Sequence, residues 1–227
     1  GLSLALELSE KTNHEILVFD KESGAGRHAS GRNSGVIHSG INQKPGTLKA
    51  QLCLEGSRLL KDFCQKHGVP FEECGTLVIG HGEDDEEKIQ ELYDMGQACG
   101  VPRLKIFTKD EIKKYDPMVR ARAALFSPTG AIVDTEKLLE AMQCLAEGKG
   151  VKFLFRHNVS RIEGSKIICE QNVFDVEHIV NCAGLFADRL AHMMGAGREY
   201  QIIPFKGEYV SVPGLWIRGM VYQVPDL

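Results

Sequence analysis

The stretch GRNSGVIHSG at residues 31–40 places three glycines and five hydrogen-bonding side chains around one apolar Val-Ile pair. Glycines let a backbone come within contact distance of a ligand, and an unliganded loop has little reason to keep an apolar pair among such neighbours. We therefore expect the longer glycine-rich segment 24–46 to be a functional loop. The alternative is a polar surface loop whose glycines only form turns.

The polar side chains of this segment suit a phosphate ligand. Hydroxyl, amide and guanidinium groups donate the hydrogen bonds that a pyrophosphate accepts. The residues concerned are Ser30, Arg32, Asn33 and Ser34. Histidine is the side chain that exchanges a proton near neutral pH, so His38 is the candidate catalytic base or orienting group in the loop.

The residues before the loop indicate part of a nucleotide-binding unit. Residues 1–12 have the apolar spacing of a short helix, and 15–22 form a compact apolar run ending in acid, which predicts a strand buried on both faces of a parallel sheet. Asp20 stands about 20 residues after Gly1, the separation between a phosphate-binding glycine turn and the acid that binds a ribose. The alternative is a solvated acid at a strand end. A helix followed by such a strand is the second half of a βαβ unit, whose first strand is expected outside this sequence.

Beyond the loop, helices and strands alternate. Helices are expected at 47–67, about 83–99, 108–115, 135–149 and 186–194. Strands are expected at 75–81, 123–134 around a Pro-Thr-Gly turn, 151–163, 166–184 and 202–212. The predicted class is α/β, with a discontinuous nucleotide-binding domain at 1–45 and 150–200. An inserted α+β domain with a mostly antiparallel sheet is expected at 46–149 and 201–227.

Composition narrows the possible partners. The chain has 227 residues, a net charge of −4, and lysines and arginines that are scattered rather than massed, so we expect no nucleic-acid partner. Its seven cysteines form no CxxC pair, which favours free thiols in a reducing compartment and no metal site. No apolar run approaches the roughly 20 residues of a membrane span. The chain begins and ends abruptly, and we expect it to be cut from something longer.

Seven stretches in this order and spacing closely resemble the L-2-hydroxyglutarate dehydrogenases, members of the D-amino-acid-oxidase-like group of FAD-dependent oxidoreductases. The resemblance covers essentially the whole chain. The stretches are GRNSGVIHSGI, LKAQLC, CGTLVIG, TGAIVD, NCAGLFAD, IIPFKGEY and YQVPD.

The resemblance implies a Rossmann-like FAD-binding domain with an inserted substrate domain. It also implies non-covalent FAD and oxidation of L-2-hydroxyglutarate, a 2-hydroxy dicarboxylate, to 2-oxoglutarate by hydride transfer to the flavin. Electrons would pass to a quinone or another acceptor. The implied location is the bacterial cytoplasm with peripheral contact to the inner membrane, or alternatively the mitochondrion.

Carried over by position, the resemblance assigns roles to individual residues. Cofactor-binding residues would be Gly1, Asp20, Lys21, Ser30, Arg32, Asn33, Ser34, Gly35, Val159, Ala183 and Gly184. His38 would approach the isoalloxazine, while Lys206 and Arg32 are candidates for binding the substrate carboxylates. Asp20 stands where relatives commonly have Glu, and Lys206 where they often have Arg.

Two other functions stay open. One keeps the fold and changes the substrate to glycerol 3-phosphate or an amino acid. The other is a non-catalytic FAD-binding fragment.

Overall fold

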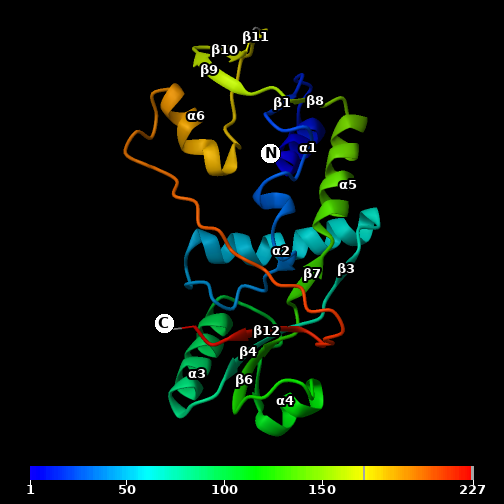
Figure 1. Ribbon diagram of the computed structural model, residues 1–227, viewed down its shortest axis with the longest axis vertical. Helices are drawn as coiled ribbons and strands as arrows, with labels where there is room; N and C mark the ends of the chain where they lie inside the picture. Colours follow the sequence, from blue (N-terminus) through cyan, green and yellow to red (C-terminus); the bar gives the residue numbers. More distant parts are fainter. Residues whose placement is uncertain (171, 226–227) are drawn as a thin grey trace. The chain divides into compact units, whose positions relative to one another are not determined.

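The computed structural model describes residues 1–170 and 172–225, and the chain divides into two compact units (Figure 1). The first unit comprises Gly1–Asn33 and Thr135–Ser211, and the second comprises Ser34–Asp134 and Val212–Leu227. The expected boundaries near 45, 150 and 200 therefore differ from the observed ones. One reason is helix α5 (Thr135–Gly148), which packs on α1 (Leu2–Lys11) and so belongs to the first unit. The last residue of the YQVPD stretch lies outside the described residues.

The first unit contains a parallel pair of strands. β1 (Leu17–Asp20) runs parallel to β8 (Lys152–Phe155), as the parallel-sheet prediction required (Figure 1). Ala5 of α1, Ala146 of α5 and Val151 form a buried cluster beside these strands. β1 is only half-buried, contrary to the expectation of burial on both faces, because β8 is its one paired neighbour among the described residues.

The first unit also holds a three-stranded antiparallel sheet. Its strands are β9 (Val159–Glu163), β10 (Lys166–Cys169) and β11 (Asn172–Asp175), in the order β11-β10-β9. The one-turn 3-10 helix η2 (Gly184–Phe186) then leads directly into α6 (Ala187–Met193). The phenyl rings of Phe19 and Phe174 meet edge to face at 5.0 Å and connect β1 with β11.

Two predicted strand segments are wrong. The part of 166–184 that follows β11 and the segment 202–212 form no strand among the described residues. An extended segment becomes a strand only when a neighbour supplies the other half of a hydrogen-bond ladder, and no described strand lies beside either. Val180 is consequently 61% exposed and Phe205 is 93% exposed.

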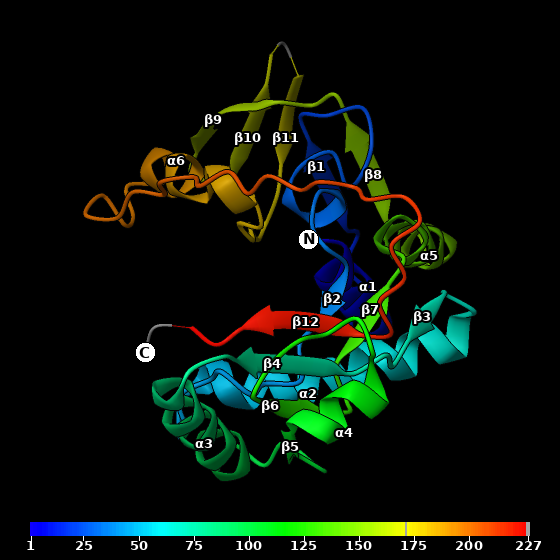
Figure 2. The same ribbon diagram turned by 60° about the horizontal axis from the view of Figure 1, so that its bottom comes forward.

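A four-stranded sheet forms the centre of the second unit (Figure 2). Its order is β12-β4-β6-β5, with β12 parallel to β4 and the other pairs antiparallel. The strands are β4 (Thr76–Gly80), β5 (Lys105–Thr108), β6 (Ala123–Ser127) and β12 (Met220–Gln223). The helices that pack on this sheet are α3 (Glu83–Ala98) and α4 (Lys109–Tyr115).

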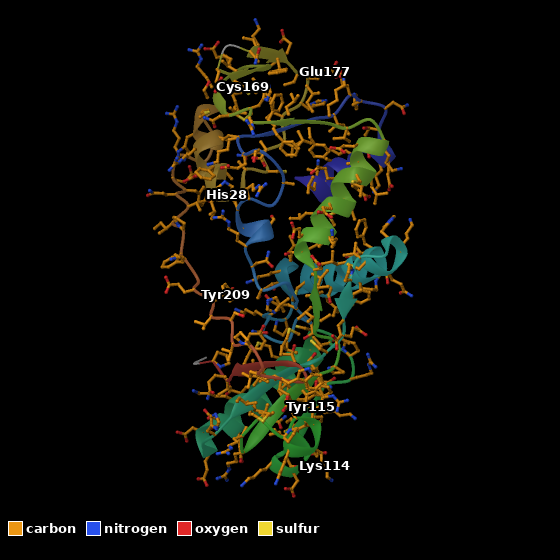
Figure 3. All side chains as sticks on the ribbon, turned by 45° about the vertical axis from the view of Figure 1, so that its right-hand side comes forward. His28, Lys114, Tyr115, Cys169, Glu177 and Tyr209 are labelled. Carbon is orange, nitrogen blue, oxygen red and sulfur yellow. The ribbon has the colours of Figure 1, made fainter. Side chains whose placement is uncertain are left out.

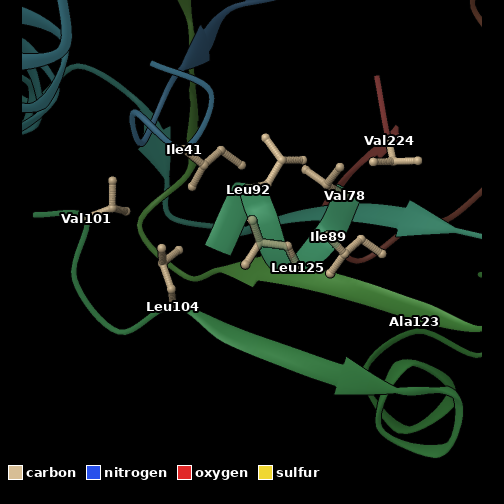
Figure 4. Close-up of a cluster of buried hydrophobic side chains, with 9 residues drawn as sticks. All are labelled: Ile41, Val78, Ile89, Leu92, Val101, Leu104, Ala123, Leu125 and Val224. Carbon is tan, nitrogen blue, oxygen red and sulfur yellow. The ribbon is translucent and has the colours of Figure 1, made fainter. Parts of the chain in front are cut away.

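Successive side chains of these strands point to opposite faces of the sheet, and both faces are buried. Val78 and Leu125, paired across β4 and β6, pack with Ile89 of α3 in one cluster (Figure 4). Leu77 and its neighbours pack with Ile112 of α4 in another. Two covered faces require consecutive apolar residues, which is the pattern that predicted β4 and β6.

A second small sheet joins the start of the second unit to its middle. β2 (Val36–Ile37) and β3 (Phe71–Glu72) both pair antiparallel with β7 (Ala131–Val133). The strands predicted around the Pro-Thr-Gly turn are thus confirmed, although β6 and β7 enter different sheets.

Helix α2 (Leu48–His67) confirms the prediction for 47–67. The Thr47 hydroxyl accepts a hydrogen bond from Ala50 N–H at 3.2 Å, and Gly68 ends the helix with φ at 68°. All seven cysteines, which lie in the described part of the chain, are free thiols.

Candidate functional site

The carboxyl end of β1 places the predicted ribose-binding acid. Asp20 is half-buried, and its Oδ1 accepts a hydrogen bond from Glu22 N–H at 2.9 Å. Its backbone carbonyl accepts from His157 N–H at 2.9 Å, which fixes the segment just before Val159 and β9. Within the described residues, the second carboxylate oxygen has no hydrogen-bond partner. Asp20 can therefore accept hydrogen bonds from a ligand at this strand end.

The amino end of α1 lies beside the second predicted cofactor turn. Gly1 is the N-cap of α1, and a Cβ built on Gly1 would lie 3.8 Å from Cys182 Cβ. No side chain caps this helix, and its first turn carries no acid. Its first amides are therefore available to an anion such as a phosphate.

Asn181 shapes the turn that follows. Its Oδ1 accepts from Ala183 N–H at 3.1 Å, and its Nδ2 donates to Ala187 O at 2.7 Å. Gly184 sits in the turn with φ at 54°, in the left-handed region. The structure thus brings Gly1, Ala183 and Gly184 to one place.

The glycine-rich loop is folded tightly upon itself. A Cβ on Gly31 would lie 2.1 Å from the carbonyl oxygen of Gly26, so the backbone approaches itself here. Asn33 Nδ2 donates to Ala29 O at 2.9 Å and Ser30 O at 2.8 Å, which holds the 3-10 helix η1 (Ala29–Gly31). Figure 3 labels His28, the residue that precedes η1. The side chain of Asn33 is thus used inside the loop, whereas Ser30 and Arg32 are exposed.

His38 combines an exposed imidazole with an anchored backbone. It directly follows β2, where Ile37 is buried, and it precedes Ile41, a member of the main core cluster of the second unit. Gly35, with φ at 68°, accepts a hydrogen bond from Val133 N–H at 2.8 Å, while Ser34 is exposed. An exposed polar side chain on a backbone fixed at both ends suits a functional role.

Lys206 lies in the segment for which a strand was predicted and none is found. Its side chain is 82% exposed, and Nζ lies 2.9 Å from Glu208 Oε1. Lys206, Arg32 and most of the predicted cofactor residues belong to the first unit, whereas Ser34, Gly35 and His38 belong to the second.

A hollow of about 730 Å³ runs along α2 in the second unit. Ser39, the residue after His38, lines it together with Lys61 and Glu73. Lys61 Nζ is already engaged by Glu73 Oε1 at 2.7 Å and by Thr129 O at 2.6 Å. Because the partly buried Lys61 cation is paired, this hollow offers no ready site for an anionic substrate.

Several polar and aromatic residues of the first unit escaped the sequence analysis. Glu22 and His28 meet at 2.8 Å, and Phe186 lies against Lys21 and Arg189. Lys21 and Phe186 are far apart in the sequence, and an irregular segment separates Glu22 from His28, so no helix or strand periodicity signals these contacts. The exception is Asn181, which stands before an Ala-Gly turn where side-chain to backbone hydrogen bonds are common.

The described residues contain no group of three or more potential metal ligands. None of their helices is long and apolar enough to cross a membrane.

The hydrogen-bonding groups of the first unit are of the kinds that bind an adenine dinucleotide. A free carboxylate oxygen of Asp20 lies at the end of β1, an uncapped helix end lies beside Cys182, and hydroxyl and guanidinium groups lie in the loop. The chain belongs to the FAD dependent oxidoreductase family, whose sequence model matches residues 1–226. FAD is therefore the cofactor expected of this chain.

The relatives within that family include several L-2-hydroxyglutarate dehydrogenases. The chain is 32% identical to the human mitochondrial enzyme over 93% of the chain and 50% of that protein. It is 31% identical to an Escherichia coli L-2-hydroxyglutarate dehydrogenase over the whole chain and 56% of that protein. A glycerol 3-phosphate dehydrogenase from Caloramator mitchellensis is 32% identical over the whole chain and 48% of its own length. The chain thus spans about half the length of these relatives.

A solved structure has the same fold. L-alpha-glycerophosphate oxidase from Mycoplasma pneumoniae, with FAD bound, matches 99% of this chain and 62% of its own with a TM-score of 0.81 and 24% identity. This likeness confirms the predicted fold class.

Proposed function

We propose that the protein to which this chain belongs binds FAD non-covalently and oxidises L-2-hydroxyglutarate to 2-oxoglutarate. The similarity to L-2-hydroxyglutarate dehydrogenases over at least 93% of the chain carries this proposal. Bound FAD supplies a two-electron acceptor for the hydride at C2 of the substrate. A quinone or another acceptor then takes the electrons, at a peripheral membrane contact or in the mitochondrion.

The first unit would hold the dinucleotide. Asp20 would accept hydrogen bonds from the ribose hydroxyls, and the amides after Gly1 would face the pyrophosphate. Ser30, Arg32 and Asn33 would line the same ligand, with Val159, Ala183 and Gly184 supplying backbone contacts. Lys21 would support the site through its contact with Phe186. In the second unit, Ser34 and Gly35 would continue this lining toward the flavin.

His38 would accept the proton of the C2 hydroxyl, and Arg32 and Lys206 would bind the two carboxylates. The anchored backbone on either side of His38 supports this role, because a general base must hold its orientation while the proton moves.

A substitution of His38 tests this assignment. In the complete protein, His38→Ala should lower kcat about 100-fold or more with L-2-hydroxyglutarate and a dye as electron acceptor. FAD should stay bound, as judged by the visible spectrum. His67→Gln, in the last turn of α2, is the matched control and should leave kcat unchanged. Equal kcat for wild type and His38→Ala would remove His38 from the mechanism.

A second substrate keeps the same site. The glycerol 3-phosphate dehydrogenase from Caloramator mitchellensis is as similar to the chain as the human enzyme is. A panel that contains L-2-hydroxyglutarate, glycerol 3-phosphate and L-amino acids separates the two proposals, because the diacid should give the highest kcat/KM. A higher value for glycerol 3-phosphate would favour the alternative.

A further inference from the structure

The ring of Phe186 is a meeting point for three segments of the first unit. Lys21 Nζ lies 3.7 Å from the ring centroid, and the guanidinium carbon of Arg189 lies 5.2 Å from it. The imidazole of His28 meets the same ring edge to face, with centroids 5.7 Å apart and an interplanar angle of 74°. The end of β1, the glycine-rich loop and the turn after Asn181 therefore converge on one aromatic side chain.

The carboxylate of Glu22 supplies a negative charge beside Lys21 and His28. Its Oε1 lies 2.8 Å from His28 Nε2 and 3.6 Å from Lys21 Nζ. The hydrogen bond from His28 holds the pKa of Glu22 below its ordinary value. The carboxylate is therefore charged at neutral pH and links the loop to the end of β1.

One hydrogen bond connects this cluster to Asp20, the predicted ribose-binding acid. Asp20 Oδ1 accepts from Glu22 N–H at 2.9 Å, so the position of Glu22 sets the orientation of the Asp20 carboxylate. Phe186 ends η2, the short helix that begins at Gly184. A shift of the ring would therefore move both the acid and the second cofactor turn.

We propose that Lys21, Glu22, His28 and Phe186 are positioning residues that hold the dinucleotide site in its binding geometry before FAD arrives. This inference rests on the proposed binding of FAD by the first unit. Preorganisation raises affinity because less ordering is left to be done on binding. The half-exposed setting limits the strength of each contact, since cation–π and ion-pair interactions weaken in water. Loss of one contact should therefore weaken FAD binding severalfold without unfolding the protein.

FAD affinity of the complete apoprotein tests the proposal. Phe186→Leu keeps an apolar side chain and removes the aromatic face, and Lys21→Met keeps the chain length and removes the charge. Each should raise the Kd for FAD about fivefold, measured by the quenching of flavin fluorescence. Phe186→Tyr keeps the aromatic face and should restore the wild-type Kd.

A double mutant shows whether the two groups act through each other. Phe186→Leu combined with Lys21→Met should raise Kd about as much as either change alone, because both remove the same interaction. Lys11→Met is the matched control, since Lys11 forms an exposed ion pair with Glu7 at the other end of α1. That variant should bind FAD as wild type does.

The outcomes distinguish a failure of the proposed function from a failure of this inference alone. A wild-type apoprotein that binds no FAD overturns the proposed function and this inference with it. If wild type binds FAD while Phe186→Leu and Lys21→Met bind equally tightly, only the inference fails. A Phe186→Tyr variant as weak as Phe186→Leu, or fully multiplicative effects in the double mutant, would also overturn it.

Discussion

Gly31 lies at a point of the glycine-rich loop where no larger residue fits. A Cβ at this position would lie 2.1 Å from the carbonyl oxygen of Gly26, 2.9 Å from its carbonyl carbon and 3.1 Å from its Cα. Real Cβ atoms essentially never come within 3.0 Å of such an atom, so the two backbone segments would have to separate by about 0.9 Å in Gly31→Ala. All three clashing atoms belong to the backbone, and no side-chain rotation relieves the contact.

The expected cost follows from that overlap. Forced overpacking costs about 1–3 kcal/mol, and we expect Gly31→Ala to lower the free energy of unfolding of the complete apoprotein by about 2 kcal/mol. Displacement of η1 also moves Ser30 and Arg32, so the Kd for FAD should rise by at least tenfold.

Gly24→Ala is the matched control in the same loop. Gly24 has no heavy atom within 4 Å of a built Cβ, and its φ lies outside the left-handed region. This variant should unfold like wild type or be stabilised by up to about 1 kcal/mol, because alanine restricts the unfolded chain. Guanidinium unfolding followed by circular dichroism measures both variants, and equal stability of Gly31→Ala and Gly24→Ala would refute the reasoning.

Three further predictions concern the same fold. Asp116 is 3% exposed and accepts hydrogen bonds from Met118 N–H at 2.9 Å and Arg218 N–H at 2.7 Å. Asp116→Ala should cost about 3 kcal/mol because two hydrogen bonds to a charged group are lost; thermal unfolding checks this, and a loss under about 1 kcal/mol would contradict it. Thr47→Ala removes the cap of α2 and should cost about 1 kcal/mol in guanidinium unfolding, whereas Thr47→Ser should restore most of it. The backbone N–H of Ile202, at 3.0 Å, is the main cause of the lowered pKa of Asp188. A carboxylate with a lowered folded-state pKa stabilises the fold above the unfolded value of about 3.9, and this contribution is lost as the pH falls through the folded value. The protection factor of this amide, which corrects its exchange rate for the intrinsic pH dependence of amide exchange, should therefore fall below about pH 4 and stay constant between about pH 5 and 7.

Local signals in the sequence were sufficient to predict the helices. Thr47 and Gly68 bracket α2 because a side-chain cap and a left-handed glycine each act within a few residues. The same holds for α4, where Thr108 and Glu111 form a capping box. These interactions are short in sequence and can be read without knowledge of the fold.

The strands depended on partners that the local sequence does not specify. β12 pairs with β4, which lies far from it in the sequence, and the four residues of β12 alone do not predict a strand. The segment 202–212 has an equally apolar sequence, yet no described strand pairs with it. Strand formation is therefore decided by tertiary neighbours rather than by composition.

The candidate site likewise contains some features that local sequence indicates and others that only the folded chain creates. Asp20 and His38 could be chosen as candidates because a strand end and a glycine-rich loop are visible in the sequence. The contact between Gly26 and Gly31 and the convergence on Phe186 could not, since both depend on how segments fold against each other. The strand that was predicted to carry Lys206 does not form among the described residues.

Anaerobic reduction of the flavin by substrate tests the central claim most directly. The purified complete protein should show the absorption bands of oxidised FAD near 450 nm, and L-2-hydroxyglutarate should bleach them within one turnover, much faster than glycerol 3-phosphate does. A protein without flavin absorbance, or one bleached by glycerol 3-phosphate and not by L-2-hydroxyglutarate, would contradict the account.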